Sequence, residues 1–587
     1  MTSHRYRSRL HQCALSIALL CLMTPGASAQ LPDLERVRTP VRFSGEMGSF
    51  GELYSVTGRE QRRPSSTGRL FVRSSLDLFG TVKVGLDLSY STESGSNLGM
   101  GTSRQPFNQV GIAPEWRWGR AYAGSFSDTY SPLTWDGVRM RGAGFNINPG
   151  PVRFAAFHGR SQTATPGGAL DGAYQRTVTG GRIGYGRRAQ SGEGGYIDLV
   201  FLRAADDPSS LPPPGAAGVD VTSSAVPLNE FAVTPQENIV AAAVTRVPFW
   251  NGRLLWTGEV AASMHARDRR APELTEDALD EYAGLLRSLM TPRASTYGDI
   301  AHNGRLELRD LPLPGSADKT PRTLSAGVGY RYIGAGYVSL GLASLPADQQ
   351  SIMADVSIRS ACWNASVRGM TQHDNLLDQK LSTTTRNRLT ASASVRPSRS
   401  LRSSLRASFN TVRNDTDTAD RQVDYSTWTL STTHSLALGQ RRLLRSVAFN
   451  YAYQQADDAA PGRDDRALRA HDTSVRVTLQ AARSVTLTPS VGIALTRTGA
   501  AEWEARHTYS LAAQYRSGGR WSTSASIANA RLNAGGSLQG AVSARYQLTR
   551  ADMVTLGVRS NRVNGLATQS GSFHENRVTV NWTRSIR

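Results

Sequence analysis

The side chains best placed to do chemistry in this sequence are charged residues that alternate with apolar ones. In "TVKVGLDLSY" (81–90), Lys83 and Asp87 share one parity, and the other parity is apolar. Successive side chains of a β-strand point to opposite faces, so such a segment has one charged and one apolar face. Charged groups on one face can attract and pass ions if water reaches them. We expect the following residues to line a water-filled lumen: Arg73, Asp77, Lys83, Asp87, Arg476, Thr478, Arg559 and Arg577.

The charge balance of this face favours anions over cations. Basic residues outnumber acidic ones among these candidates, as they do in the whole chain, where 67 Lys and Arg oppose 47 Asp and Glu. We therefore expect a raised local anion concentration that fades as salt rises. The arginines are spread along the strands and form no basic block, so we expect no nucleic-acid partner.

Catalysis and metal binding find little support. The histidines are scattered, and neither an HExxH motif nor a paired cysteine site is present. In "GRDDRALRAHD" (462–472), Asp464, Asp465 and Asp472 could hold a cation, but a solvated charged loop is the simpler interpretation. Cys362 has no neighbouring histidine to activate its thiol. We expect no catalytic residue, no metal site and no cofactor, and thus no enzyme.

The alternation recurs along most of the chain and indicates strands. Clear examples are "SVTLTPSVGIALTR" (484–497) and "VTLGVRSNRV" (554–563). Strands of about nine to eleven residues with one apolar face match a tilted bilayer crossing in a transmembrane barrel. A soluble sandwich would need a second sheet to cover the apolar faces, and a β-solenoid would show a fixed repeat, which we do not find.

The N-terminus has the features of a secretory signal peptide. A basic stretch precedes the apolar run "CALSIALLCLM" (13–23), and the small residues Ala27 and Ala29 predict cleavage after Ala29. The run is shorter than the roughly 20 residues that a membrane-spanning helix needs. We expect Sec-type export, with the signal peptide over 1–29 and a short periplasmic segment over 30–40.

Short and long connections alternate between the strands. A barrel inserted from the periplasm has tight periplasmic turns and longer outer loops. Counting on this rule gives 26 strands, from 41–57 to 574–586, with both termini in the periplasm. A count of 24 is the alternative, because 346–350 and 498–503 are brief for outer loops. The predicted short turns include 79–81, 118–120, 148–151, 250–253 and 333–336, and the predicted long loops include 92–107, 205–236, 267–323, 372–385, 412–424 and 455–470.

The predicted fold is therefore all-β: a single transmembrane antiparallel up-and-down β-barrel over 41–587, with one short helix in a long outer loop. The insertion 267–323 carries this helix and is the candidate plug or lid. Its segment "ELTEDALDEYAGLLRSLM" (273–290) has apolar residues at helical spacing. A helix packed on neighbouring outer loops and a gate in the lumen both fit the pattern. The candidate gate residues are Leu279, Tyr282, Leu285, Leu286 and Leu289.

On these features the chain resembles a large outer-membrane β-barrel of a Gram-negative bacterium. Two stretches, "RRPSSTGRLFVRSSLDLFG" (62–80) and "YRYIGAGYVSLGL" (330–342), resemble poorly characterised outer-membrane barrel proteins. The resemblance implies location in the outer membrane, contact with its lipid and assembly by the barrel assembly machinery, and it transfers no activity. The final segment "RVTVNWTRSIR" departs from the usual assembly signal, because Arg584 interrupts it and Arg587 takes the place of a terminal aromatic.

Three functions remain open for such a barrel. We expect a porin-like pore or conduit with an arginine-rich lumen, for passive or gated passage of solutes. The first alternative is a non-enzymatic export or surface-assembly barrel that acts with periplasmic or surface protein partners. The second is a barrel-based hydrolase, whose Ser, His and acidic groups would come from different strands. A TonB-dependent receptor is not expected, because the strand pattern begins near residue 41 and leaves no room for a preceding plug domain.

Overall fold

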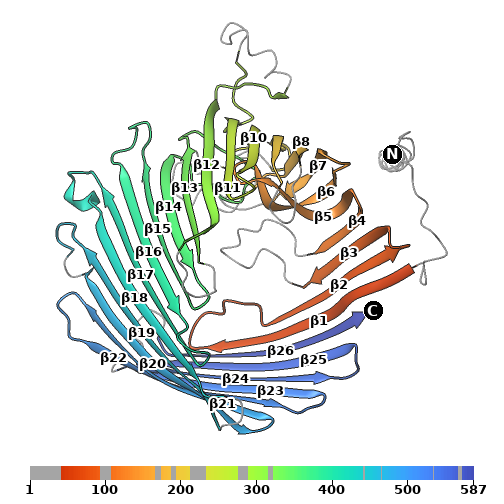
Figure 1. Cartoon of the computed structure of the whole chain (residues 1–587). Helices are drawn as coiled ribbons and strands as arrows, with labels where there is room; N and C mark the ends of the chain where they lie inside the picture. Colours follow the sequence, from red (N-terminus) through yellow and green to blue (C-terminus); the bar gives the residue numbers. More distant parts are fainter. Residues whose placement is uncertain are drawn as a thin grey trace, which may run out of the picture.

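The chain folds into one closed antiparallel sheet (Figure 1). The computed structural model describes residues 41–92, 108–164, 173–186, 194–211, 233–274, 289–314, 322–439, 443–463, 466–532, 535–565 and 571–586. The expected signal peptide, with Ala27 and Ala29, and the expected segment 30–40 lie outside these ranges.

The first and last strands close the barrel. β1 (Val41–Thr57) pairs antiparallel with β26 (Phe573–Ile586), from Gly45 opposite Ile586 to Thr57 opposite His574. Every other strand pairs with its two neighbours in the chain, and all belong to one 26-stranded sheet. Closure satisfies the backbone groups that an open edge would leave unpaired, which a sheet in a bilayer requires. The predicted count of 26 is confirmed, and the alternative of 24 is wrong.

The strands span 8 to 17 residues. A short 3-10 helix, η3 (Ala419–Arg421), lies between β17 and β18. Within the described ranges, no helix is long and apolar enough to cross a membrane. Between β1 and β26 the strands are β2 (Ser66–Leu78), β3 (Val82–Ser91), β4 (Gln109–Trp116), β5 (Gly119–Ser131), β6 (Trp135–Ile147), β7 (Val152–Gln162), β8 (Arg176–Gly186), β9 (Tyr196–Asp206), β10 (Glu237–Phe249), β11 (Leu254–Ala266), β12 (Thr296–Pro312), β13 (Thr323–Ile333), β14 (Gln349–Arg359), β15 (Trp363–Asp374), β16 (Thr384–Val395), β17 (Leu401–Asn414), β18 (Asp424–Ala437), β19 (Leu444–Asp458), β20 (Leu468–Ala482), β21 (Val485–Thr498), β22 (Glu504–Arg516), β23 (Trp521–Leu532), β24 (Gly535–Gln547) and β25 (Asp552–Asn564).

Connections differ in length at the two ends of the barrel. Those after even-numbered strands are mostly tight turns, such as 148–151 and 250–253. In the second, Trp250 and Asn251 both have positive φ, 48° and 53°, as the two central residues of a type I′ turn require, and Gly252 N donates to the Phe249 carbonyl oxygen at 3.0 Å. Those after odd-numbered strands are mostly longer, such as 207–236 and 375–383. Since tight turns face the periplasm in such barrels, we assign the first end to the periplasm and the second to the outside.

Two sequence predictions about these connections are wrong, and they compensate. The segment 267–323 is not one insertion, because β12 crosses the sheet within it. The alternation of β12 is weak, since Gly298, His302 and Gly304 fall on its lipid-facing parity. Conversely, 333–336 is not a short turn, because it opens the long connection 334–348. The predicted turn implied a strand over 337–345 that the structure lacks, so the total remained right.

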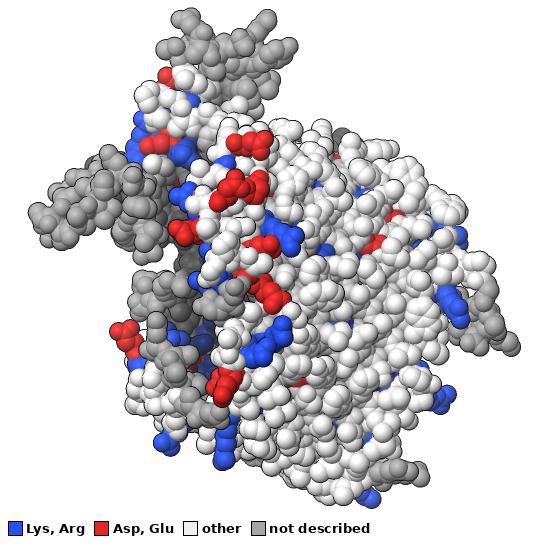
Figure 2. All heavy atoms as spheres, turned by 90° about the vertical axis from the view of Figure 1, so that its left-hand side faces the viewer, with Lys and Arg blue, Asp and Glu red and all other residues white. Residues whose placement is uncertain are grey.

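The outward face of the wall is apolar. Its exposed side chains include Val491 at 56% and Val542 at 50% exposure, and their neighbours on the strand face the opposite side. Figure 2 shows a broad field of this face with few charged side chains and a dense group of Lys, Arg, Asp and Glu along one margin. A charge near the bilayer midplane would cost about 2–4 kcal/mol, so this field suits a lipid environment.

Candidate functional site in the barrel lumen

Two connections fold into the interior of the barrel and meet there. One is 132–134, between β5 and β6, and the other is 334–348, between β13 and β14. The Tyr337 hydroxyl donates to the Leu133 carbonyl oxygen at 2.8 Å, and Ser339 Oγ donates to the Thr134 carbonyl oxygen at 2.6 Å. These strand pairs are not neighbours in the wall, so the contact runs through the lumen.

Side chains of the wall anchor both connections. Asn238 on β10 is fully buried; its Nδ2 donates to the Val338 carbonyl oxygen and its Oδ1 accepts from Leu340 N, each at 3.0 Å. The Ser263 hydroxyl on β11 donates to the same Val338 carbonyl oxygen at 2.5 Å. Because buried polar groups that lose such partners are costly, the anchors hold 334–348 in one position.

A buried carboxylate on β11 holds the other connection. Glu259 accepts hydrogen bonds from Ser131 Oγ at 2.5 Å and from the Leu133 backbone N–H at 3.3 Å. Asn303 on β12 donates to its second oxygen at 3.4 Å. Glu259 is 3% exposed, so these donors replace the water that an ionised carboxylate would otherwise need.

An apolar core fills the space between these connections and the wall. Burial of each large apolar side chain stabilises the folded state by about 1.5–3 kcal/mol. This sector of the lumen therefore contributes to the stability of the fold. Gly341 is required by the close packing: a Cβ there would lie 2.5 Å from both Leu202 Cδ2 and the Thr134 carbonyl oxygen. We call this region the packed sector; its fully buried members include Leu133, Trp135, Met140, Leu202, Val240, Ile333 and Tyr337.

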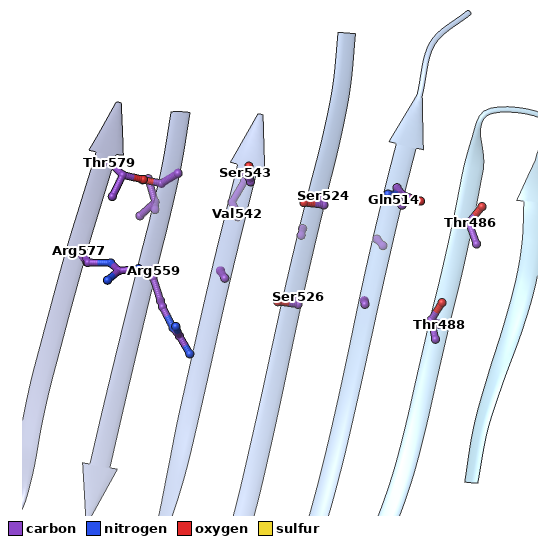
Figure 3. A pocket seen from close by; sticks show the side chains of 16 residues that line it. Thr486, Thr488, Gln514, Ser524, Ser526, Val542, Ser543, Arg559, Arg577 and Thr579 are labelled. Atoms are coloured by element: carbon purple, nitrogen blue, oxygen red, sulfur yellow. The ribbon is translucent and has the colours of Figure 1, made fainter. Parts of the chain in front are cut away.

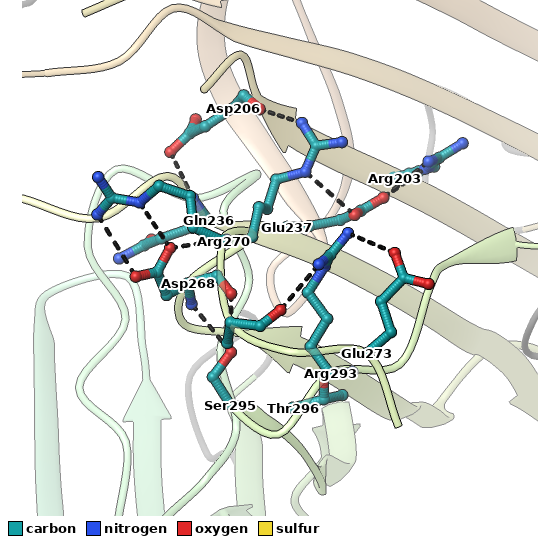
Figure 4. A network of polar contacts seen from close by, with 12 residues as sticks. Arg203, Asp206, Gln236, Glu237, Asp268, Arg270, Glu273, Arg293, Ser295 and Thr296 are labelled. Carbon is teal, nitrogen blue, oxygen red and sulfur yellow. Dashed lines mark hydrogen bonds and ion pairs between the residues drawn. The ribbon is translucent and has the colours of Figure 1, made fainter. Parts of the chain in front are cut away.

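A network of ion pairs lies at the outer ends of β8, β9 and β10 (Figure 4). Arg176 binds Asp206 through two hydrogen bonds of 2.7 and 3.0 Å, and Arg203 donates to Glu237 at 2.7 Å. Arg269, from the connection after β11, also contacts Glu237 at 3.3 Å. Paired arginine–carboxylate bonds are geometrically specific, so the network fixes the ends of β8–β10 relative to one another.

Contacts made by Asp348, called here the Asp348 staple, join two outer connections. Asp348, at the end of 334–348, accepts from the backbone N–H of Leu376 at 2.8 Å and of Asn375 at 3.1 Å, and pairs with Lys380. Partial burial of Asp348 opposes its ionisation, but the Lys380 contact and these two N–H donors outweigh burial and lower its pKa. The Asp348 contact in turn raises the pKa of Lys380. The packed sector is thereby tied to the connection 375–383.

The rest of the wall presents a different inner surface. From β21 to β26, small and hydroxylated side chains surround a recess of about 500 Å³ beside Arg559 and Arg577 (Figure 3). Arg559 stands directly opposite Arg577 in the β25–β26 register. The hydroxyl-bearing residues of the recess are Thr486, Thr488, Ser524, Ser526, Ser543 and Thr579.

Arginines also lie on this face of β15, β16 and β17, which are neighbours of one another in the wall. Arg368 on β15 lies opposite Thr390, and Arg388 lies two residues from Thr390 on β16. Arg406 on β17 lies opposite Ser392, two residues from Thr390 on the other side. Along the strands, the order of these three positions from the outer end toward the periplasmic end is therefore Arg388, Arg368 and Arg406. Arg386 and Arg402 continue the series at its two ends.

The structure brings some of the predicted lumen residues together. Arg73 lies opposite Asp87, with its Nε 3.7 Å from the carboxylate, and Asp77 lies opposite Lys83. Arg577 also approaches Glu52 of β1 at 3.8 Å. Followed from strand to strand, the pairing register puts all eight candidates on the face that carries Asn238 and Glu259; Arg476 and Thr478 lie on β20, away from the other six.

The candidate gate helix is only partly described. Leu279, Tyr282, Leu285 and Leu286 lie outside the described ranges. Leu289 packs against a buried cluster of Ile239, Ala266 and Met290. Ile239 and Ala266 lie on the parity opposite Asn238 and Ser263. The described end of this connection therefore covers the outside of the wall, not the lumen.

Other candidate chemistry is not assembled where the structure can be described. Asp464 and Asp465 lie outside the described residues, while Asp472 lies on β20. Among the residues described, no group of three or more His, Cys, Asp or Glu side chains could hold a metal ion.

Sequence reasoning missed the packed sector and its anchors. Apolar residues alternate with small or polar ones along 337–345 as they do in a strand. The sequence therefore did not indicate that this segment folds into the barrel interior. The nearest signal is its composition, since Gly334, Gly336 and Gly341 weaken a strand and Pro346 follows within a few residues. The sequence does not indicate that Glu259 and Asn238 are anchors, because nothing near them in the chain shows what they contact.

Comparisons with known proteins return only distant structural likenesses. No protein-family model and no curated protein matches the chain. An anion-selective porin from Comamonas acidovorans is 10% identical, with 46% of this chain and all of that chain covered and a TM-score of 0.23. OpdK from Pseudomonas aeruginosa, solved with vanillate, is 11% identical over 60% and 93%, with a TM-score of 0.29. The ferric-catecholate import receptor Fiu from E. coli is 8% identical over 92% and 81%, with a TM-score of 0.35. What the fold itself shows is a closed antiparallel β-barrel of 26 strands.

Proposed function

We propose that this barrel is a conduit for small anionic solutes across the outer membrane. The path runs beside the packed sector, along the inner faces of β15–β26. The observation that carries the proposal is the stepped series of Arg368, Arg388 and Arg406 on neighbouring strands. The conduit performs no chemistry and needs no cofactor.

The geometry of the series suits a passing anion. Two residues along a strand span about 6.6–6.8 Å, so a carboxylate leaving one guanidinium comes within reach of the next. Guanidinium forks bind carboxylate and phosphate oxygens through two hydrogen bonds. Several moderate sites in succession permit both entry and release, which passage requires.

The charges of the series are not neutralised by the wall. Arg388 donates to Asn410 Oδ1 at 2.9 Å, a neutral partner. Asp355 stands opposite Arg368 in the register, but its carboxylate binds Arg305 at 2.6 Å. Across the described part of the chain, no acidic side chain forms an ion pair with Arg368, Arg388 or Arg406. Their combined field would concentrate anions, less so as salt screens it.

The test is ion selectivity in planar bilayers. The reversal potential across a KCl gradient should show anion preference, and Arg368→Gln/Arg388→Gln/Arg406→Gln should reduce or abolish it. Arg399→Gln/Arg483→Gln/Arg520→Gln removes equal charge from exposed periplasmic turns and should leave selectivity unchanged. Cation preference in the native protein, or equal effects of the two triple variants, would refute the proposal.

A further inference from the structure

We infer that a basic and aromatic patch at the outer ends of β19–β22 binds the phosphate of a phosphorylated glycolipid in the outer leaflet. The patch, called here the rim patch, consists of Tyr453, Arg469, His471, Arg497 and Trp503. It lies on the outward face of the wall, so it is independent of the proposed conduit.

Two arginines of the rim patch face each other directly. Arg469 on β20 stands opposite Arg497 on β21 in the pairing register. Like charges at directly opposed positions destabilise a sheet unless something offsets them. Of the residues whose contacts can be described, none forms an ion pair with either arginine. A bound anion between them is the arrangement that would offset the repulsion.

The register shows that both arginines face away from the lumen. Val475, six residues after Arg469, and Val491, six residues before Arg497, share their parity and are 41% and 56% exposed. The opposite parity of β20 carries Arg476 and Thr478. An arginine on the outward face avoids the cost of the bilayer midplane only if it sits at the headgroup level.

The position along the strands puts them at that level. Arg469 is the second residue of β20 and Arg497 the second-last of β21, at the end of the barrel with the longer connections. The apolar outward residues of β21 reach Leu495, directly before Arg497 on the same face. The arginines thus begin where the apolar belt ends, in the layer where outer-leaflet phosphates lie.

Aromatic rings complete the patch. The His471 ring centroid lies 4.9 Å from that of Tyr453 and 5.5 Å from that of Trp503. The Arg497 guanidinium stacks over the Trp503 ring, 5.2 Å from its centroid. Aromatic girdles mark the membrane interfaces of barrels, and their faces suit the apolar side of a sugar ring. Two guanidinium forks beside such rings match a phosphate carried on a sugar.

Asp457, an acid on this face, is engaged elsewhere. Asp457 on β19 lies on the same parity, but its carboxylate accepts from Gln455 Nε2 at 2.7 Å. Gln455 stands opposite Arg469 on the side away from Arg497. The space between the two arginines is therefore left for an external anion.

The test measures lipid binding by the folded full-length mature chain in non-ionic detergent, with native mass spectrometry as the readout. The probe is bisphosphorylated lipid A. Arg469→Gln/Arg497→Gln should weaken binding at least about tenfold, because two charge-assisted contacts are lost. Trp503→Ala should also weaken it. Arg483→Gln/Arg520→Gln, in turns at the opposite end of the barrel, should bind like the native protein.

Two further arms identify the ligand chemistry. Lipid A without phosphates should bind at least as weakly as bisphosphorylated lipid A binds the double variant. Inorganic phosphate in millimolar excess should not displace the lipid. Equal binding of the two lipids, equal binding by the two double variants, or displacement by inorganic phosphate would each overturn the inference. Arg469→Lys/Arg497→Lys, which keeps the charge but not the forks, provides a second test if the glutamine variant does not fold; native-like affinity in it would refute the bidentate site.

Discussion

The Tyr337 hydroxyl donates a hydrogen bond of 2.8 Å to the backbone carbonyl oxygen of Leu133. The two residues belong to connections between different, non-adjacent strand pairs, and they are 1% and 0% exposed. This contact joins two parts of the chain inside the barrel. The contact is part of the packed sector, and the proposed conduit runs beside that sector, which leads to the following predictions.

Removing the main anchor should widen the conduit. Asn238→Ala deletes the hydrogen bonds to Val338 and Leu340. Val338 keeps its bond from Ser263, but the Leu340 N–H loses its acceptor, at a cost of about 1–3 kcal/mol. We expect larger and noisier single-channel conductance in planar bilayers. Asn450→Ala on β19, which removes only a 3.4 Å bond to Ser474, is the matched control. Unchanged conductance in a destabilised Asn238 variant would show that 334–348 does not limit flow.

Adding one carbon at Gly341 should destabilise the barrel. Its Cβ would meet the Thr134 carbonyl oxygen at 2.5 Å, and a backbone atom cannot move aside cheaply. Overpacking of this kind costs about 1–3 kcal/mol, so Gly341→Ala should lower the temperature at which the detergent-solubilised barrel changes its gel mobility. Gly540→Ala meets no atom within 4 Å and should leave this temperature nearly unchanged. Equal midpoints for both variants would contradict the packing.

The staple between Asp348 and the connection 375–383 should weaken in acid. The pKa of Asp348 is lowered from its ordinary 3.8, so its stabilisation is present above that value and is lost as pH falls through the lowered pKa. Hydrogen-exchange protection of the Asn375 and Leu376 amides, corrected for intrinsic rates, should therefore drop only below pH 3.8. Asp348→Asn should lower it at neutral pH as well, while Asp378→Asn should not. Protection that is independent of both pH and Asp348 would exclude the staple.

Labelling of Cys362, the one cysteine among the described residues, tests which end of the barrel faces the periplasm. Cys362 is exposed in the turn after β14, at the end assigned to the periplasm. A maleimide on a large polymer, too bulky for the lumen, should label it only after the outer membrane is opened. Thr418→Cys in a Cys362→Ser background lies in the connection 415–423 and should be labelled in intact cells. Labelling of native Cys362 in intact cells would invert the orientation.

The sequence by itself determined the wall of the barrel. Strand periodicity and turn chemistry are local, so segments such as Val485–Thr498 and the turn at Trp250 and Asn251 could be predicted from a few adjacent residues. The predicted count of 26 strands is right although it includes a strand over 337–345, which the structure lacks, and omits the strand over 296–312. Each of these two segments changes the count by one, so the two errors cancel. The relation between faces also follows locally, since parity persists along a strand and register carries it to the next.

Only the tertiary structure decided what fills the barrel. Glu259 and Ser131 are hydrogen-bonded although 128 positions separate them, and Asn238 meets Leu340 across 102. The rim patch and the stepped arginines likewise depend on register between strands that alternation alone does not fix. Alternation states which face a residue takes, but it carries no information on which distant segment shares that face. Apart from the closing pair β1–β26, the wall is built from contacts between strands that follow one another in the chain, whereas the interior is built from contacts that exist only once the sheet has closed.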